Sequence, residues 1–354
     1  MRNAPLLALM FLGIASMNNT DSAENLNAIN TISASDTRIA SMGRSVKNAD
    51  SSVQFAFPGV SFFANFTGKT LSLEAFSSSN NSYLDVYIDN KDAQIIKLTQ
   101  TPQTYVLLQE NQSTPHNLRI VHRSETWQGI VTLKTLSTDG YFQKAPELPT
   151  RKILVLGDSV TCGEAIDRVE GETKNSRWWN PSASYGMLTA NAVKAQVQLV
   201  CYGGKGLVRS WNGKTDEPKL PEFYQDAITS NQKWNQQDYQ PDVIISAIGT
   251  NDFTQGIPDR EAYISTYVKF ITQLLIDHKH AQILLTEGAI LNGEKKSALV
   301  DYLKETIKRV DDKRVHHVKS THYPGDKTDA HPTKEQHALM AEDLIPQLKT
   351  IMKW

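Results

Sequence analysis

Two short polar segments of the chain could together supply a nucleophile and a base. Ser159 ends the segment ILVLGDS, and His331 lies within TDAHPT, two residues after Asp329. A serine, a histidine and a group that orients the histidine are the parts of an acyl-transfer site. Taken alone, Ser159 is equally well explained as a helix N-cap, which any junction of a strand and a helix can use.

Two further segments could stabilise an oxyanion. Glycines in CYGGKGL, residues 201–207, would let the backbone approach a ligand and present N–H groups to it. In GTNDF, residues 249–253, the amide of Asn251 can donate hydrogen bonds without carrying charge. Taken alone, the glycine segment could be a tight turn or a phosphate loop, although its spacing fits neither of the nucleotide-binding patterns GxGxxG and GxxxxGK(S/T). Asn251 taken alone could be a turn asparagine.

His331 is the favoured base among the nine histidines because it lies beside an acid where a loop enters a helix. Pro332 fits the first turn of that helix. The expected buried face of the helix comprises Ala338, Ala341, Ile345 and Leu348. We expect His337 to be solvated one turn further along, and His322 is the nearest rival to His331.

The elements that must position these residues alternate between strand and helix from about residue 146. Apolar strand candidates are KILVL, VQLVC, DVIISAI, QILLTE and RVHHVKS, and helical periodicity is clearest in residues 259–279 and 295–312. Apolar strands separated by helices predict a parallel sheet covered on both faces, with its site at the carboxyl ends of the strands. The four polar segments converge on that edge, which favours catalysis.

Residues 53–136 have a different pattern. Short apolar runs alternate with turn residues, as in YLDVYIDN and HNLRIVHRSE, and no run keeps a helical period. We predict an antiparallel β-sandwich for residues 24–145, with a mobile segment up to about residue 50. The proline-containing segment GYFQKAPELPT is expected to link it to an α/β domain at residues 146–354.

The N-terminus predicts export. One arginine precedes an apolar run from Pro5 to Ala15, and Gly13 and Ala15 are small residues placed as a cleavage site would need. The run is shorter than the ~20 apolar residues of a membrane span, so residues 1–23 are expected to be a signal peptide and leader. The protein would then be secreted or periplasmic. The alternative is a disordered apolar start.

The charge and cysteine content argue against a nucleic-acid-binding protein, a protein that binds anionic membranes and a cysteine-rich zinc protein. With 37 basic and 38 acidic residues and a net charge of -1, neither a nucleic-acid partner nor an anionic membrane surface is favoured. The two cysteines, Cys162 and Cys201, are too few for a cysteine-rich zinc site. They could form one disulfide or remain two buried thiols.

The segments LGDSVTCG, YGGKGL, GTNDF and DAHP resemble the sequence blocks of the SGNH, or GDSL-type, hydrolases. From GRSVKN at residue 43 to the C-terminus, the chain is similar to carbohydrate esterase family 2, which joins a jelly-roll β-domain to a flavodoxin-like, three-layer SGNH domain. The resemblance implies removal of acetyl groups from plant polysaccharides such as xylan or glucomannan, often at the sugar 6-hydroxyl. It implies no metal and no other cofactor.

The resemblance also implies residue roles. Ser159 is the expected nucleophile and His331 the expected base. The backbone N–H groups of Ser159 and Gly204 and the amide of Asn251 would hold the oxyanion. The aspartate of many SGNH enzymes lies three residues before the histidine, where this chain has a threonine. Asp329 could therefore orient His331 through its carboxylate or through its backbone carbonyl.

Three functional classes are compatible with these features. They are a deacetylase of polysaccharides or oligosaccharides, a lipase or thioesterase on the same fold, and a non-catalytic glycan-binding protein. The loops at residues 164–182 and 208–219 are polar and contain tryptophans, which favours the first class over an enzyme with an apolar acyl slot. Trp178, Trp179 and Trp211 could stack on sugar rings, although a loop aromatic is more often local packing.

Overall fold

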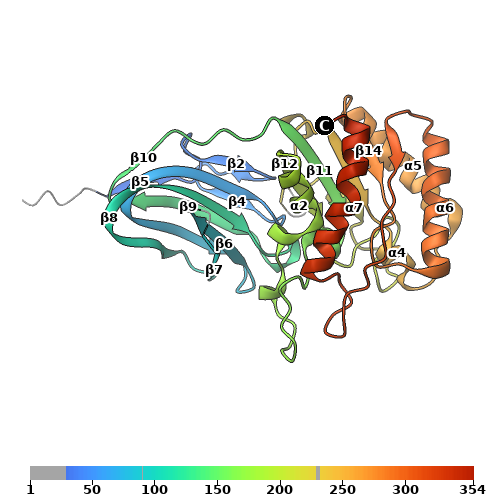
Figure 1. Ribbon diagram of the computed structural model, residues 1–354, viewed down its shortest axis with the longest axis horizontal. Helices are drawn as coiled ribbons and strands as arrows, with labels where there is room; N and C mark the ends of the chain where they lie inside the picture. The colour runs from blue at the N-terminus through green and yellow to red at the C-terminus, as the bar shows by residue number, and fades with distance from the viewer. Residues whose placement is uncertain (1–28, 90, 229–231) are drawn as a thin grey trace, which may run out of the picture.

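The chain folds into a β-domain followed by an α/β domain, which lie side by side along the long axis of the molecule (Figure 1). The computed structural model describes residues 29–89, 91–228 and 232–354. The predicted signal peptide falls outside these residues. Residues 143–150, which connect the two domains, form no helix or strand.

The β-domain is one system of antiparallel strands. Its main path runs β3-β4-β9-β5-β8-β6-β7, while β1 pairs with β9, and β2 and β10 pair with β5. The strands are β1 Asn30–Ser33, β2 Ala40–Met42, β3 Val46–Lys47, β4 Val53–Phe55, β5 Ser61–Ser77, β6 Tyr83–Ile88, β7 Gln94–Lys97, β8 Gln103–His122, β9 Val131–Thr138 and β10 Tyr141–Phe142. The predicted antiparallel domain is confirmed.

Two long strands, β5 and β8, form the backbone of this domain. They are 17 and 20 residues long and pair along most of their length (Figure 1). Buried and partly exposed residues alternate in β5, so that Phe62, Ala64 and Phe66 point into the core. The register shifts next to Gly68, and such a bulge lets a long strand bend.

The segment before residue 50, for which the sequence predicts mobility, forms strands instead. Asn30 of β1 is in register with Thr138 of β9, and β2 pairs with β5. Ile32 and Met42 are buried on these strands. The prediction was wrong from residue 30 onward because a few apolar side chains at core-facing positions outweigh a polar composition.

The α/β domain contains a five-stranded parallel sheet in the order β12-β11-β13-β14-β15. Its strands are β11 Arg151–Gly157, β12 Ala195–Cys201, β13 Val243–Ala247, β14 Gln282–Leu285 and β15 Val315–His317. The α-helices are α1 Ser159–Cys162, α2 Tyr185–Ala192, α3 Leu220–Phe223, α4 Thr250–Thr254, α5 Arg260–Asp277, α6 Gly293–Val310 and α7 Lys334–Met352. The predicted parallel sheet is confirmed, and every predicted strand overlaps an observed one.

Helices cover both faces of this sheet (Figure 1). In β11, Leu154 and Leu156 belong to the core that includes residues of α5 and α6, whereas Ile153 and Val155 belong to the core that includes residues of α2 and α7. Successive residues of a strand point to opposite faces, so one fully apolar strand supplies two cores. The result is the expected three-layer arrangement.

The last helix, α7, is rotated relative to its predicted orientation. Its buried residues are His337, Met340, Ala341, Leu344 and Leu348. His337 is fully buried and not solvated, because its Nδ1 accepts a hydrogen bond from the Tyr185 backbone N–H at 3.2 Å and its ring stacks on that of Tyr185. Burial lowers the pKa of His337 to about 3, so the ring is neutral.

A buried arginine joins the two domains. Arg44, between β2 and β3, is 1% exposed, and its Nη1 donates to the carbonyls of Tyr224 at 2.6 Å and Asp226 at 2.8 Å. Its guanidinium also lies over the rings of Phe57 and Tyr224. Arg44 therefore fixes the β-domain against the segment that follows α3.

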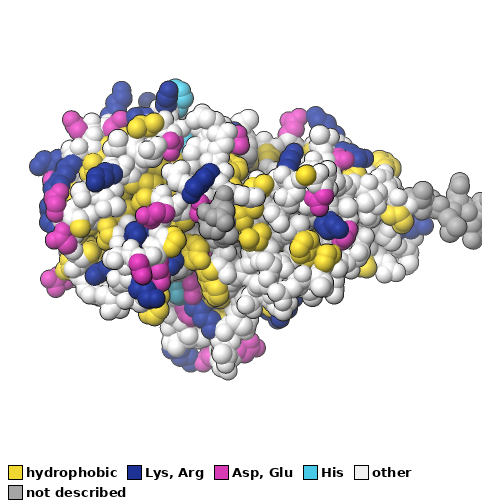
Figure 2. Space-filling model, turned by 180° about the vertical axis from the view of Figure 1, so that it is seen from behind, with side chains coloured by type: hydrophobic (Ala, Val, Ile, Leu, Met, Phe, Trp, Pro, Cys, Tyr) yellow, Lys and Arg dark blue, Asp and Glu magenta, His cyan; other side chains and the backbone are white. Residues whose placement is uncertain are grey.

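The surface carries both signs of charge. On the face shown in Figure 2, acidic and basic side chains intermingle over the α/β domain. Within the part of the chain that the structure describes, no helix combines the length and apolar character that a membrane crossing requires. In the same residues, no three His, Cys, Asp or Glu side chains gather as a metal ion would need.

Candidate active site

Ser159 lies just beyond the carboxyl end of β11. The strand ends at Gly157, and Asp158 caps α1 by accepting a hydrogen bond from the Val160 backbone N–H at 3.1 Å. A Cβ at Gly157 would collide with the side chain of Thr161, so this turn has no room for a larger residue. Ser159 is the first helical residue, and its N–H has no acceptor within the helix.

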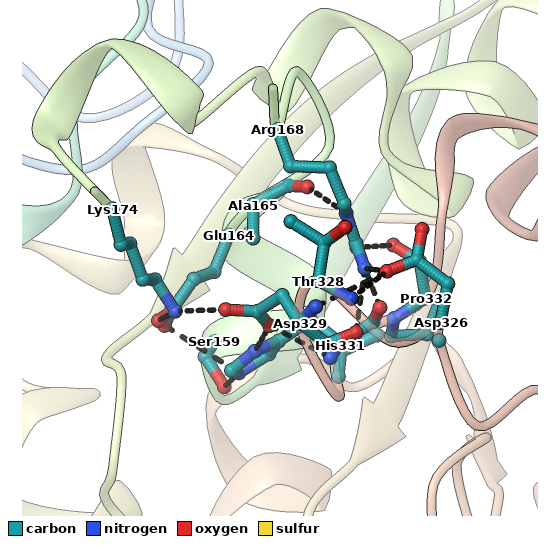
Figure 3. A network of polar contacts seen from close by, with 12 residues as sticks. Ser159, Glu164, Ala165, Arg168, Lys174, Asp326, Thr328, Asp329, His331 and Pro332 are labelled. Atoms are coloured by element: carbon teal, nitrogen blue, oxygen red, sulfur yellow. Dashed lines mark hydrogen bonds and ion pairs between the residues drawn. The ribbon is translucent and has the colours of Figure 1, made fainter. Parts of the chain in front are cut away.

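His331 is within hydrogen-bonding distance of Ser159 (Figure 3). Its Nε2 lies 2.9 Å from Ser159 Oγ, and its Nδ1 lies 2.6 Å from Asp329 Oδ1. The same carboxylate oxygen accepts the backbone N–H of His331 at 2.9 Å. The β11–α1 junction and the loop before α7 thus bring a hydroxyl, an imidazole and a carboxylate together, an arrangement that can remove a proton from serine.

The carboxylate of Asp329, and not its backbone carbonyl, faces the imidazole. The carbonyl oxygen instead accepts a hydrogen bond from Arg168 Nη1 at 2.6 Å. Arg168 Nη2 reaches the carbonyls of His331 at 2.5 Å and Pro332 at 2.8 Å. In this geometry the carboxylate contacts the imidazole, while the Asp329 carbonyl is bound by the guanidinium of Arg168.

The surrounding charges favour an imidazolium. Burial opposes a charge on His331, but the hydrogen bond with Asp329 and the field of Glu164 raise its pKa. Burial also opposes the charge of Asp329, yet hydrogen bonds from His331 and Lys174 hold the pKa of this carboxyl well below its usual range. Asp329 is therefore ionised at neutral pH and fixes the tautomer that leaves His331 Nε2 facing the serine.

The glycine loop after β12 is held at both of its ends. Asn251, in α4, donates from Nδ2 to the Lys205 carbonyl at 2.8 Å. The Gly203 N–H donates to the carboxylate of Glu125, which belongs to the β-domain. Between these anchors Gly204 has a φ of 73°, in the left-handed region, and its N–H has no acceptor among the described residues.

Asp252, the neighbour of Asn251, fixes the next part of the same loop. Its carboxylate accepts the backbone N–H groups of Leu207 at 2.8 Å, Val208 at 2.7 Å and Arg209 at 3.1 Å. Burial raises the pKa of Asp252 to about 6, and these hydrogen bonds oppose the rise. The segment GTNDF therefore anchors the glycine loop at Lys205 and again at residues 207–209.

Cys162 and Cys201 form a disulfide, with their Cα atoms 5.7 Å apart. Cys162 ends α1 and Cys201 ends β12. The bond thus joins the helix that begins with Ser159 to the strand that leads into the glycine loop. Of the two alternatives that the sequence leaves open, the bridge is the observed one.

The loop tryptophans differ in exposure. Trp178 and Trp179 are 3% and 4% exposed and pack together with Ala165, so the prediction that Trp178 stacks on a sugar was wrong. Trp211 is 56% exposed and lies against Gly204, where an added Cβ would be 2.7 Å from Trp211 Cδ1. Trp127, which sequence reasoning did not single out, is 52% exposed beside Trp179.

Several further residues of the site were missed from the sequence: Glu125, Glu164, Arg168 and Lys174. Each acts through a contact between distant parts of the chain, as when Arg168 binds the carbonyls of residues 329, 331 and 332. No periodicity or spacing in the sequence reports such a contact. His322, the rival base, instead directs its Nδ1 to the Ala289 carbonyl at 3.1 Å.

Two protein-family models match the chain. Residues 41–146 match the model described as carbohydrate esterase 2 N-terminal, and residues 155–339 match the GDSL-like lipase/acylhydrolase family. The acetylxylan esterase / glucomannan deacetylase of Cellvibrio japonicus is 55% identical over 345 residues, which are 96% of this chain and 96% of the relative. The chain belongs to carbohydrate esterase family 2. This carbohydrate esterase is a carboxylic-ester hydrolase.

Solved structures agree with the architecture of this esterase. A family two carbohydrate esterase from Cellvibrio japonicus has a TM-score of 0.91 at 56% identity, covering 92% of this chain and 99% of that one. A family two carbohydrate esterase from Clostridium thermocellum in complex with cellohexaose has a TM-score of 0.84 at 25% identity, covering 89% and 99%. The predicted pairing of a jelly-roll β-domain with an SGNH-type α/β domain is confirmed.

Proposed function

We propose that this esterase is secreted or periplasmic and removes O-acetyl groups from plant polysaccharides of the xylan or glucomannan type through an acetylated Ser159. The observation that carries the proposal is the distance of 2.9 Å between Ser159 Oγ and His331 Nε2, with Asp329 on the other ring nitrogen. The activities named for the relative from Cellvibrio japonicus support the substrate class. The cellohexaose complex of the enzyme from Clostridium thermocellum supports a polysaccharide partner.

In the proposed reaction, His331 Nε2 takes the hydroxyl proton of Ser159 while Oγ attacks the acetyl carbonyl. The N–H groups of Ser159 and Gly204 and the amide of Asn251 stabilise the tetrahedral oxyanion. The intermediate collapses, and the sugar hydroxyl leaves with the proton from His331. Water then attacks acetyl-Ser159 with His331 as base, and acetate is released. Asp329 stabilises the imidazolium that forms in both steps.

In polysaccharides built of hexoses, such as glucomannan, the 6-hydroxyl is the proposed position of the acetyl group; xylose has no carbon 6, so the acetyl groups of xylan lie on ring carbons. Ser159 is only 6% exposed, so an ester must protrude from the polysaccharide to reach its hydroxyl. An acetyl group on the exocyclic primary carbon extends further from the sugar ring than one on a ring carbon. Proton NMR of acetylated glucomannan during digestion tests this position: the 6-O-acetyl signals should disappear first, and earlier loss of ring-carbon acetyl groups would reject it.

Export is proposed from two observations. Residues 1–23 have the composition of a signal peptide and leader. Cys162 and Cys201 form a disulfide, and disulfides persist in oxidising compartments but are rare in the cytosol.

A comparison of substrates tests the proposed activity. Acetate release is measured from acetylated xylan and acetylated glucomannan, and kcat/KM is measured for acetyl, butyryl and octanoyl esters of one chromogenic alcohol. We expect acetate release from the polysaccharides and a kcat/KM that falls as the acyl chain lengthens. A preference for the octanoyl ester would favour a lipase or thioesterase, and no hydrolysis of any ester would favour a glycan-binding protein.

A further inference from the structure

A carboxylate from the β-domain contacts the glycine loop of the candidate active site. Glu125 lies between β8 and β9, at the start of the short helix η1 Thr126–Gln128, and it is fully buried. Its Oε1 accepts the Gly203 backbone N–H, and its Oε2 accepts the Trp179 Nε1–H at 2.6 Å. One side chain therefore ties the β-domain to two separate loops of the α/β domain.

The fit between this carboxylate and the loop depends on glycine. A Cβ at Gly203 would collide with the carboxylate oxygens of Glu125. The neighbouring Thr126 donates its Oγ1–H to the Cys201 carbonyl at 3.2 Å. The turn at residues 125–126 thus contacts the chain at Cys201 and Gly203, immediately before Gly204.

We propose that Glu125 is a positioning residue for deacetylation, which holds the glycine loop so that the Gly204 N–H points at the oxyanion. The inference rests on the proposed function, because that function assigns Gly204 to the oxyanion hole. Asn251 and Asp252 hold the other end of the loop at residues 205–209, so the loss of Glu125 removes the side-chain anchor at Gly203. A donor stabilises a transition state well only when it is already in place, and loosening the loop therefore lowers kcat more than it raises KM.

The environment of Glu125 opposes its charge. Burial, followed by the nearby Glu164, raises the pKa of Glu125 to about 7, although the hydrogen bonds from Trp179 and Gly203 oppose the rise. Burial, followed by the charge of Glu125, raises the pKa of Tyr202, and Glu164 is itself paired with Lys174. A protonated carboxyl loses an acceptor site, so both hydrogen bonds are complete only when Glu125 is ionised, above a pH of about 7.

The Glu125→Gln variant tests the inference, because an amide presents N–H groups where Gly203 or Trp179 needs an acceptor. We expect a fall in kcat of about 10- to 100-fold on a small activated acetyl ester, with KM nearly unchanged. The ratio of wild-type to variant kcat should shrink as pH falls from about 8 to 5.5, because the wild-type carboxyl is then protonated as well. A purely structural role would leave this ratio independent of pH.

Two further variants make the outcome decisive. Gly203→Ala displaces the carboxylate from the opposite side and should cause a similar loss of kcat, so the inference stays testable if Glu125→Gln folds poorly. Arg44→Met removes another buried contact between the domains without touching the glycine loop. It should lower Tm and leave kcat within about twofold of wild type.

A folded Glu125→Gln variant with wild-type kcat, or with a kcat ratio that does not change with pH, would overturn the inference. The Ser159→Ala variant separates this result from failure of the proposed function. If Ser159→Ala is inactive while Glu125→Gln is fully active, only the inference about Glu125 fails. If Ser159→Ala remains active, the proposed function fails first.

Discussion

Lys174 donates a hydrogen bond to Asp329 Oδ2 at 2.8 Å, which leaves Oδ1 of the same carboxylate for the imidazole of His331. The lysine also lies 2.5 Å from Glu164 Oε1. Asp329 and Glu164 both raise the pKa of His331, whereas Lys174 lowers it. Glu164 and Lys174, both in the loop at residues 164–182, therefore contribute to the pKa of the proposed base.

Lys174→Met should move the acid limb of the pH profile to higher pH. The proposed base acts in its neutral form, so kcat/KM falls as the pH drops below the pKa of His331. Removal of the positive charge lets that pKa rise further. The measurement is kcat/KM for an acetyl ester across pH, with Lys174→Arg as the control that keeps the charge. A limb that stays in place or moves to lower pH would contradict this role.

Asp329→Ala should reduce kcat on the order of 10²-fold or more, close to the loss in His331→Ala. The carboxylate faces Nδ1, while the backbone carbonyl that the substitution preserves is bound to Arg168. Kinetics of both variants on the same acetyl ester provide the measurement. A loss of only a few-fold would return the orienting role to the main chain.

Asn251→Ala should reduce kcat by about 10²- to 10³-fold with little change in KM, because an oxyanion donor acts mainly in the transition state. The substitution also releases the Lys205 carbonyl. Steady-state kinetics check the prediction, and circular dichroism checks that the variant is folded. A rise in KM with unchanged kcat would instead place Asn251 in substrate binding.

The disulfide between Cys162 and Cys201 should contribute to stability. It joins residues 39 positions apart, and removal of a bond that closes such a loop typically costs about 2–5 kcal/mol. Replacement of both cysteines by serine should lower the free energy of unfolding by this amount in a denaturant titration. Titration of thiols in the unfolded protein should find them only after reduction. Free thiols before reduction would contradict the bridge.

Trp211→Ala should impair substrate binding, whereas Trp178→Ala should impair stability. Trp211 is exposed beside Gly204, so its loss should raise KM for acetylated polysaccharide and leave kcat/KM for a small acetyl ester nearly unchanged. Trp178 is buried, and its loss should lower Tm through the cavity that it leaves. Equal effects of Trp211→Ala on both substrates would rule out a sugar platform.

The parts of the fold that the sequence predicts well are those set by local pattern. The apolar strand at residues 153–156 and the helical period of α5 indicate a covered parallel sheet, and the rule that sites lie at carboxyl ends places Ser159 and His331 at one edge. The contact between these two residues does not follow from the strand order, because β13 and β14 lie between β11 and β15. Their distance of 2.9 Å could come only from the structure.

The failures come from interactions between distant segments. The buried face of α7 includes His337, whose Nδ1 accepts the backbone N–H of Tyr185, and a histidine in a sequence gives no sign of that partner. Trp178 is buried by its own loop. Glu125 belongs to another domain and meets Gly203 only through domain packing, so its position in the β-domain sequence gave no reason to connect it with the site.

The central claim is that Ser159 carries the acetyl group during turnover. Mass spectrometry of the enzyme, acid-quenched while it hydrolyses an activated acetyl ester, tests this claim most directly. We predict one acetyl group on the peptide that contains Ser159, and neither labelling nor acetate release in Ser159→Ala. Acetylation of a different residue, or near-parental activity of Ser159→Ala, would contradict the account.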